Sequence, residues 1–143
     1  IALYGNEITG EIPTHLGNLD SLVILSLGQN QLSGRTPTEI GHLTSLLKLS
    51  LNNNKLSQLI PSEIGNLSNL SWLSLCSNVL EGSIPSQVGN LIELEYFDLG
   101  LNLLTGPIPP EIVNIRFLQE FNLASNRLTG TIPSGFGTLV NLT

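Results

Sequence analysis

The sequence is poor in the residues that build covalent or metal-bound sites. It has one cysteine, Cys76, and two histidines, His15 and His42, among 143 residues. A single cysteine excludes an internal disulfide framework, and one thiol with two scattered imidazoles cannot complete the four-ligand shell of a zinc site. Neither histidine has an obvious Asp or Cys partner for catalysis, and the glycines follow a period rather than a phosphate-binding motif. We therefore expect no metal, no cofactor and no enzymatic activity.

Charged and aromatic residues are also scarce. Charged residues make up 11 % of the chain and aromatic residues 5 %, and the formal net charge is −6 with no basic cluster. This balance argues against nucleic acid or an anionic membrane surface as a partner. The hydrophobic fraction of 41 % is normal, so the core must be aliphatic. No apolar run approaches the ~18 residues of a membrane span, and the absence of Met and of a signal-peptide pattern indicates a processed or excised piece.

The chain does contain an internal period of 24 residues, without one insertion or deletion. Asparagine recurs at this interval at Asn6, Asn30, Asn54, Asn78, Asn102 and Asn126. Proline keeps the same step at Pro13, Pro37, Pro61, Pro85, Pro109 and Pro133. A fixed period of this kind is the signature of a solenoid. We expect one solenoid domain over residues 1–143, with repeats at 1–21 (partial), 22–45, 46–69, 70–93, 94–117 and 118–141, and another beginning at 142–143.

The unit LSWLSLCSNVLEGSIPSQVGNLIE, from residue 70, indicates what each position does. Residues two apart on a strand point the same way, so Leu73 and Leu75 face inward. Trp72, Ser74 and Cys76 therefore face outward. Further along, a glycine permits a turn and a proline ends a second extended segment. No unit can bury its leucine face alone, so the coils must stack with their columns in register.

The asparagine column has a structural explanation. Asn78 follows the strand where the backbone bends, and each backbone group left unpaired in the interior costs about 1–3 kcal/mol. A carboxamide carries donors and an acceptor, so it can satisfy such groups in its own coil and the next. We therefore assign this column a structural role and no ligand role. Beyond it, Ser86 is expected to cap a short helical turn.

Each unit reads LxxLxLxxNxLxGxIPxxLGxLxx and resembles the plant-type leucine-rich repeat over the whole chain. The resemblance implies an α/β solenoid: a right-handed superhelix with a parallel β-sheet on the concave face, short second strands, and 3₁₀ or helical turns on the convex side. Three residues depart from the pattern. Gln58 and Val113 replace glycines, where we expect an altered local bend without loss of the coil. Thr36 replaces isoleucine, where we expect a weaker core contact.

Paired-cysteine caps, common in this family, are absent, so we expect an uncapped segment of a longer chain. Asn66, Asn69 and Asn141 each begin an N-x-[ST] triplet and are candidate N-glycosylation sites. Together with the resemblance, these triplets indicate an extracellular or cell-surface location, in the ectodomain of a membrane protein or in a secreted protein.

The outward strand positions vary freely and form columns, because neighbouring strands lie ~4.8 Å apart. The first column holds Ile24, Lys48, Trp72, Tyr96 and Glu120. Exposed aromatics rimmed by polar groups have the composition of an interface hot spot, although two stacked rings can also serve only to stabilise adjacent strands. The candidate ligand-binding residues are Lys48, Ser50, Asn52, Trp72, Ser74, Tyr96, Asp98, Glu120 and Asn122.

The resemblance implies a non-catalytic recognition module of a receptor-like kinase or receptor-like protein, in signalling or defence. Its partners would be a protein or peptide ligand and a co-receptor. Two alternatives stay open. A secreted enzyme inhibitor of the polygalacturonase-inhibiting type uses the same repeat and the same concave positions. An ice-binding protein is suggested by a hydroxyl column, interrupted by Glu81, at Thr9, Ser33, Ser57, Thr105 and Thr129.

Overall fold

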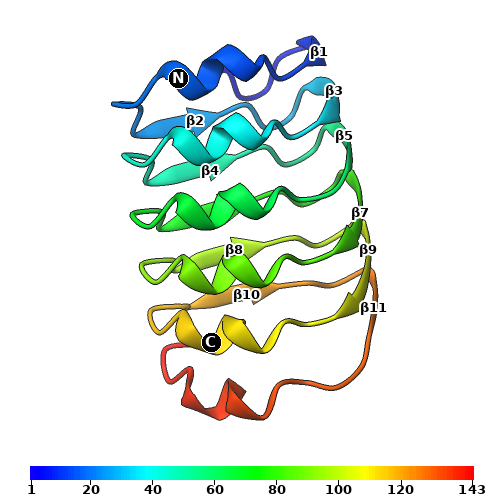
Figure 1. Ribbon diagram of the computed structural model, residues 1–143. Coiled ribbons are helices and arrows are strands. Elements are labelled where there is room, and N and C mark those ends of the chain that lie inside the picture. Colours follow the sequence, from blue (N-terminus) through cyan, green and yellow to red (C-terminus); the bar gives the residue numbers. More distant parts are fainter.

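The computed structural model of the chain describes residues 1–143 and shows a stack of similar coils (Figure 1). A five-stranded parallel sheet runs along one side of the stack in the order β10-β8-β6-β4-β2. Its strands are β2 (Ile24–Ser26), β4 (Lys48–Ser50), β6 (Trp72–Ser74), β8 (Tyr96–Asp98) and β10 (Glu120–Asn122). We call the solvent side of this sheet the concave face.

A second parallel sheet of six strands lies along a neighbouring side in the order β1-β3-β5-β7-β9-β11. Its strands are β1 (Thr9–Glu11), β3 (Gln31–Arg35), β5 (Lys55–Gln58), β7 (Val79–Ser83), β9 (Leu103–Pro107) and β11 (Arg127–Thr129). These are the short second strands that the repeat pattern predicts at LxGxIP. The predicted solenoid with a parallel sheet is therefore confirmed.

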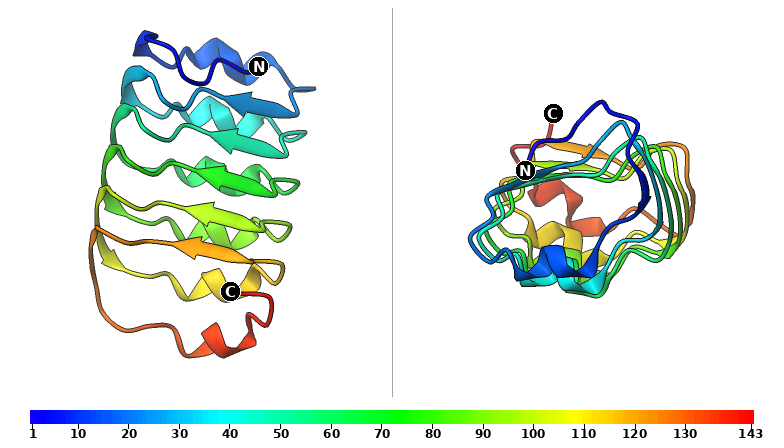
Figure 2. Two further views of the ribbon diagram at one scale, coloured as in Figure 1. Left: turned by 180° about the vertical axis from the view of Figure 1, so that it is seen from behind. Right: turned by 90° about the horizontal axis from the view of Figure 1, so that it is seen from above.

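The remaining side carries six short helices, all of the 3₁₀ type. They are η1 (Thr14–Asn18), η2 (Thr38–His42), η3 (Ser62–Asn66), η4 (Ser86–Asn90), η5 (Pro110–Asn114) and η6 (Ser134–Thr138). Viewed along the stack in Figure 2, the coils superpose, with the first sheet on one side and these helices opposite. The prediction that Ser86 caps its helix is wrong: Pro85 occupies the N-cap position and no side chain makes a capping hydrogen bond.

The interior is one cluster of 28 buried residues, aliphatic except for Phe97, that runs through the stack. Leu73 and Leu75, on the inward side in and just after β6, are fully buried. Leu49 on β4 is likewise fully buried, and Phe97 takes the same position on β8 at 1 % exposure. These column residues lie directly opposite one another, because Leu49 pairs with Leu73 and Leu73 with Phe97 in the sheet register. Each apolar face is thus buried by the next coil, which is the physical reason for the constant period.

The asparagine side chains tie neighbouring coils together. Asn78 Nδ2 donates to the carbonyl oxygens of Leu75 in its own coil, at 3.0 Å, and Leu51 in the preceding coil, at 3.1 Å. Its Oδ1 accepts from the Leu56 amide, also in the preceding coil, at 2.9 Å. The same arrangement recurs at Asn30, Asn54, Asn102 and Asn126. The cross-coil partners lie in the preceding coil and not, as the sequence suggested, in the next one, because the carboxamide projects toward the N-terminal end of the stack.

Two of the three departures from the repeat keep the backbone path. The altered bend expected at Gln58 is not seen: Gln58 adopts φ +67°, close to the +74° of Gly82 at the equivalent position, so a non-glycine residue takes the same left-handed conformation there. Thr36 is 3 % exposed, and its Oγ1 has no hydrogen-bond partner. It fills the isoleucine position with a smaller side chain and an unpaired hydroxyl, in line with the expected weaker core contact.

The third departure, Val113, is accommodated by a change in the next coil. A Cβ built on Gly89, its equivalent in the preceding coil, would lie 2.5 Å from the carbonyl oxygen of Glu111. Glycine therefore lets consecutive 3₁₀ helices approach closely. Val113 instead faces Gly135, where a Cβ would lie 2.9 Å from Val113 Cγ1. Gly135 stands where the other coils carry Glu, Gln or His, and η5 and η6 pack less closely than the other consecutive helices.

Candidate binding surface on the concave face

The first outward column of the concave face forms a ladder of stacked side chains. Lys48 pairs with Trp72 and Trp72 with Tyr96 in the register of β4, β6 and β8. The Trp72 and Tyr96 rings are parallel, with an interplanar angle of 4° and centroids 3.7 Å apart. Lys48 Nζ lies 4.6 Å from the centroid of the Trp72 ring. Since β4 and β8 flank β6, the ammonium and the phenol cover opposite faces of the indole, and the stack is held rigidly on regular strands.

Three residues are less accessible than their sequence positions suggest in the second outward column, which holds Ala2, Ser26, Ser50, Ser74, Asp98 and Asn122. The sequence predicts Ser50, Ser74 and Asp98 as ligand contacts, but these residues are 5 %, 5 % and 7 % exposed. Taller side chains on either side cover these short ones on a densely packed sheet. Each of the three also has an intramolecular hydrogen-bond partner.

Those partners lie in the first column and in a third outward column, which holds Tyr4, Gly28, Asn52, Cys76, Gly100 and Ala124. Ser50 Oγ donates to Asn52 Oδ1 at 2.7 Å, and Ser74 Oγ lies 3.6 Å from Cys76 Sγ. Asp98 accepts from the Tyr96 hydroxyl at 3.2 Å and from the Gly100 amide at 2.9 Å. The Asp98 carboxylate therefore orients the phenol at the end of the aromatic stack.

The other candidate residues remain accessible. Glu120 and Asn122 on β10 are exposed, and Asn52 and Tyr96 are half-buried. Asn122 Oδ1 accepts from the Ala124 amide at 2.9 Å, which leaves its amide nitrogen available to solvent or a ligand. The structure thus brings together one half-buried lysine, two stacked aromatics and an exposed carboxylate along a single row of strands.

Burial and the Asp98 carboxylate keep the Tyr96 hydroxyl and the Cys76 thiol protonated. Burial raises the pKa of Tyr96 to about 12, and the nearby Asp98 carboxylate adds to the shift because it disfavours a second negative charge. Burial also raises the pKa of the Cys76 thiol, and Asp98 contributes in the same direction. Tyr96 is therefore a hydrogen-bond donor to Asp98, and Cys76 is a neutral thiol with weak nucleophilic character.

Sequence reasoning listed Ile24 in the first column but left it, and the apolar residues just before β2 and β4, out of the candidate binding residues. Val23 and Leu47 precede the first column by one residue and are 44 % and 46 % exposed, and Ile24 within that column is 46 % exposed. These residues could have been recognised from the sequence, because the period places large apolar side chains at solvent positions in two adjacent coils. Glu95, just before β8, holds the position equivalent to Val23 and Leu47 and is exposed.

The remaining predicted positions lie away from this face. The hydroxyl residues lie on strands of the second sheet, but they do not pair with one another: Ser33 pairs with Lys55 and Thr105 with Arg127. Glu81 takes the equivalent position on β7. The sequon residues Asn66, Asn69 and Asn141 are exposed at or after the ends of the 3₁₀ helices. Asn69 Nδ2 donates to the Thr44 carbonyl oxygen at 2.9 Å and is part of the turn.

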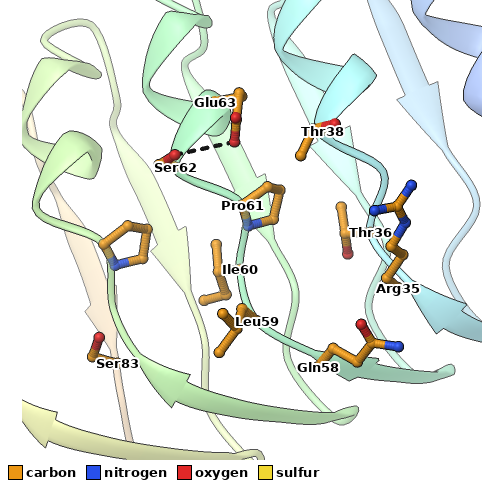
Figure 3. A pocket seen from close by; sticks show the side chains of 11 residues that line it. Arg35, Thr36, Thr38, Gln58, Leu59, Ile60, Pro61, Ser62, Glu63 and Ser83 are labelled. Carbon is orange, nitrogen blue, oxygen red and sulfur yellow. Dashed lines mark hydrogen bonds between the residues drawn. The ribbon is translucent and has the colours of Figure 1, made fainter.

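A groove of about 420 Å³ also lies on the side of the second sheet (Figure 3). Its lining includes the charged residues Arg35 and Glu63 and two departures from the repeat, Thr36 and Gln58. The Thr36 hydroxyl is shielded from solvent, so a ligand in the groove would not reach it. Elsewhere, no group of three or more His, Cys, Asp or Glu is arranged to hold a metal ion. None of the helices has the length and apolar character needed to cross a bilayer.

The chain was compared with protein-family models, curated sequences and solved structures. The family model for the Leucine Rich Repeat matches residues 21–43, 45–67, 69–91 and 117–139. Comparison with curated protein sequences finds no match. Among solved structures, the ectodomain of the Arabidopsis thaliana membrane receptor kinase GASSHO1/SCHENGEN3, in complex with CASPARIAN STRIP INTEGRITY FACTOR 2, is 41 % identical with a TM-score of 0.97. The similarity covers 98 % of this chain and 17 % of that one.

Two further Arabidopsis receptor kinases are also similar. HAESA, in complex with the peptide hormone IDA and the co-receptor SERK1, is 34 % identical with a TM-score of 0.96, over 99 % of this chain and 24 % of that one. The SOBIR1 ectodomain is 34 % identical with a TM-score of 0.87, over 93 % of this chain and 72 % of that one. The chain thus spans only a small part of the longer ectodomains. Its matched repeats and these similarities show that the chain belongs to the leucine-rich repeat family.

Proposed function

We propose that this chain is a non-catalytic recognition module that binds a protein or peptide ligand on its concave face. We place it in the extracellular region of a receptor-like kinase or receptor-like protein that acts in signalling or defence. The observation that carries the proposal is the stack of Lys48, Trp72 and Tyr96. The solenoid does not require these residues, because other coils carry Ile24 and Glu120 at the same position without loss of the strand.

The geometry suits recognition by a preformed surface. Aromatic side chains held on strands lose little conformational freedom on binding, and rigid anchors of this kind are enriched among interface hot spots. Trp72 is 36 % exposed, so a ligand can contact its edge although both faces of the ring are covered. Tyr96 and Lys48 flank it and add polar contacts.

The comparisons support a peptide ligand and a co-receptor as partners. The similar GASSHO1/SCHENGEN3 and HAESA ectodomains are each in complex with a peptide or factor, and the HAESA complex also contains SERK1. An extracellular location is supported by the GASSHO1/SCHENGEN3 relative, which is the ectodomain of a plant membrane receptor kinase. The exposed sequon residues Asn66, Asn69 and Asn141 are compatible with glycosylation at that location.

The test is selection of ligands from a displayed library of short random peptides on the immobilised chain. We expect peptides whose binding is weakened by at least about thirtyfold in a Trp72→Ala/Tyr96→Ala variant, the loss typical of a hot spot. Phe117→Ala is the matched control, since Phe117 is an aromatic residue 51 % exposed off the concave face. Circular dichroism checks that both variants fold. If the double variant retains binding, ligands use another surface and the proposal is wrong.

A further inference from the structure

The concave face changes character along the stack. Ile24 on β2 and, just before β2 and β4, Val23 and Leu47 give its N-terminal end an apolar edge, with each side chain close to half exposed. Toward the other end, Glu95 and Glu120 are exposed beside β8 and on β10. A ligand lying across the strands would therefore meet an aliphatic surface at one end and carboxylates at the other.

The aromatic stack presents one open ring face, and that face is turned toward the carboxylates. The indole of Trp72 is covered by Lys48 on one side and Tyr96 on the other. The phenol of Tyr96 is stacked only on its Trp72 side. Its other side faces β10, where Glu120 is its direct partner in the register. The Tyr96 hydroxyl donates to Asp98, which places more electron density on the ring and favours a cation over its face.

The concave face has almost no basic side chains of its own. Lys48 is the only basic residue in the outward columns, and its ammonium lies over Trp72. Glu95 accepts a hydrogen bond from Gln119 Nε2 at 3.3 Å, a neutral donor that leaves its charge uncompensated. The whole chain has a formal net charge of −6, so its long-range field also attracts a positive ligand.

We propose that the occupant of the concave face is an extended peptide segment with a basic side chain over the open face of Tyr96, next to Glu120. Aliphatic side chains of the same segment contact Val23, Ile24 and Leu47. This inference rests on the proposed function and specifies the chemistry of its ligand. The guanidinium or ammonium gains a ring face and a carboxylate together, and the aliphatic residues are removed from water.

Strand spacing predicts how far apart these two features are in the ligand. The apolar surface is centred between β2 and β4, and the cation position lies between β8 and β10. These points are three strand spacings apart in the order of the sheet, or ~14 Å at ~4.8 Å per strand. An extended chain covers ~3.4 Å per residue, so the aliphatic and basic residues are expected about four positions apart.

Peptides selected on the wild-type chain from the displayed random library test this prediction. We expect enrichment of Arg or Lys about four positions from Leu, Ile or Val, and loss of that enrichment on a Glu95→Gln/Glu120→Gln variant. One selected peptide that contains no tryptophan is then synthesised and added to the chain in increasing amounts. Its binding is followed by the fluorescence of Trp72, the only tryptophan in the chain. We expect affinity to fall about tenfold both for the variant and for a peptide with Arg→Gln, but with little further loss when the two are combined.

Glu111→Gln is the matched control, because Glu111 is an exposed carboxylate on η5, away from the concave face. It should leave affinity unchanged. Selected peptides without basic residues, or full affinity in the Glu95→Gln/Glu120→Gln variant, would overturn the ligand chemistry and leave the proposed function standing. If no peptide is selected, or if binding persists in Trp72→Ala/Tyr96→Ala, both the recognition role of this face and the inference are wrong.

Discussion

Tyr96 shows at the scale of a single residue how neighbours set the chemistry of the surface. Its ring stacks on Trp72, its hydroxyl donates to Asp98, and its strand register places Glu120 alongside. A sequence shows that a tyrosine follows a tryptophan by one period. It does not show that the two rings lie 3.7 Å apart or that the phenol is tied to a carboxylate.

The titration of Tyr96 is the first prediction at this scale. Its pKa is raised from the ordinary 10.0 to about 12, mainly by burial and then by Asp98. A raised folded-state pKa means that the unfolded chain loses the proton first, so the stabilising contribution is complete below pH 10 and is lost between pH 10 and 12. In a Tyr4→Phe background, Tyr96 is the only tyrosine, and its ultraviolet absorbance should report a midpoint of about 12.

An Asp98→Asn substitution serves as the comparison for this titration. It removes the negative charge while keeping a side chain of similar size, so the midpoint should move down toward the ordinary value without reaching it, because burial remains. A midpoint that does not respond to Asp98→Asn would show that the contact between the carboxylate and the hydroxyl is not formed in solution.

Val113 and Gly135 show at the scale of elements how a departure in one coil is matched in the next. Consecutive 3₁₀ helices approach closely where glycine lies opposite the backbone of the following helix. Val113 closes that space on η5, and Gly135 on η6 leaves room for the valine methyl groups. The pattern alone marks Val113 as irregular, but the link to a residue in the next helix follows from the packing.

This packing predicts a coupled pair of substitutions. Gly135→Glu restores the residue type seen at Glu39, Glu63 and Glu111 but overlaps Val113, and it should destabilise the fold by about 1–3 kcal/mol. The cost should be smaller in a Val113→Gly background, where space for the side chain is recovered. Urea unfolding of the single and double variants measures this coupling.

Ser134→Glu is the control for the added charge, since Ser134 is exposed at the start of the same helix. It should change stability by less than about 0.5 kcal/mol. Equal costs of Gly135→Glu in the two backgrounds would mean that the two positions do not contact each other in the folded chain.

The asparagine column connects residues to the whole molecule. Each central asparagine bonds its own coil and the preceding one, so the effect of losing it depends on its place in the stack. Asn78 makes buried bonds to both coils. Asn6 lies in the first coil, is exposed, and donates only to Leu3 and Tyr4 of its own coil.

At this scale we predict a positional difference between two identical substitutions. Asn78→Ala should lower the free energy of unfolding by ~1–3 kcal/mol, because buried amide and carbonyl groups lose their partners. Asn6→Ala should change it by less than about 0.5 kcal/mol, because water replaces its bonds. Chemical unfolding followed by circular dichroism compares them. Equal effects at both positions would contradict a ladder that joins consecutive coils.

The sequence by itself determined the solenoid. Leucines at fixed intervals cannot be buried within one unit, so the period dictates stacking, inward columns such as Leu49 and Leu73, and parallel strands. It also identified the outward columns and the aromatic pair at Trp72 and Tyr96. The residues that stack one coil on the next recur in every coil, and this repetition allows them to be recognised in a single sequence.

Only the tertiary structure decided which outward residues a ligand can reach. Ser50 and Asp98 occupy outward strand positions but are covered by neighbouring side chains, whereas Val23 and Leu47 remain exposed. The direction in which a side chain points follows from the alternation along one strand. Accessibility depends on the size and hydrogen bonding of side chains in adjacent coils, and the packing of those side chains follows no period.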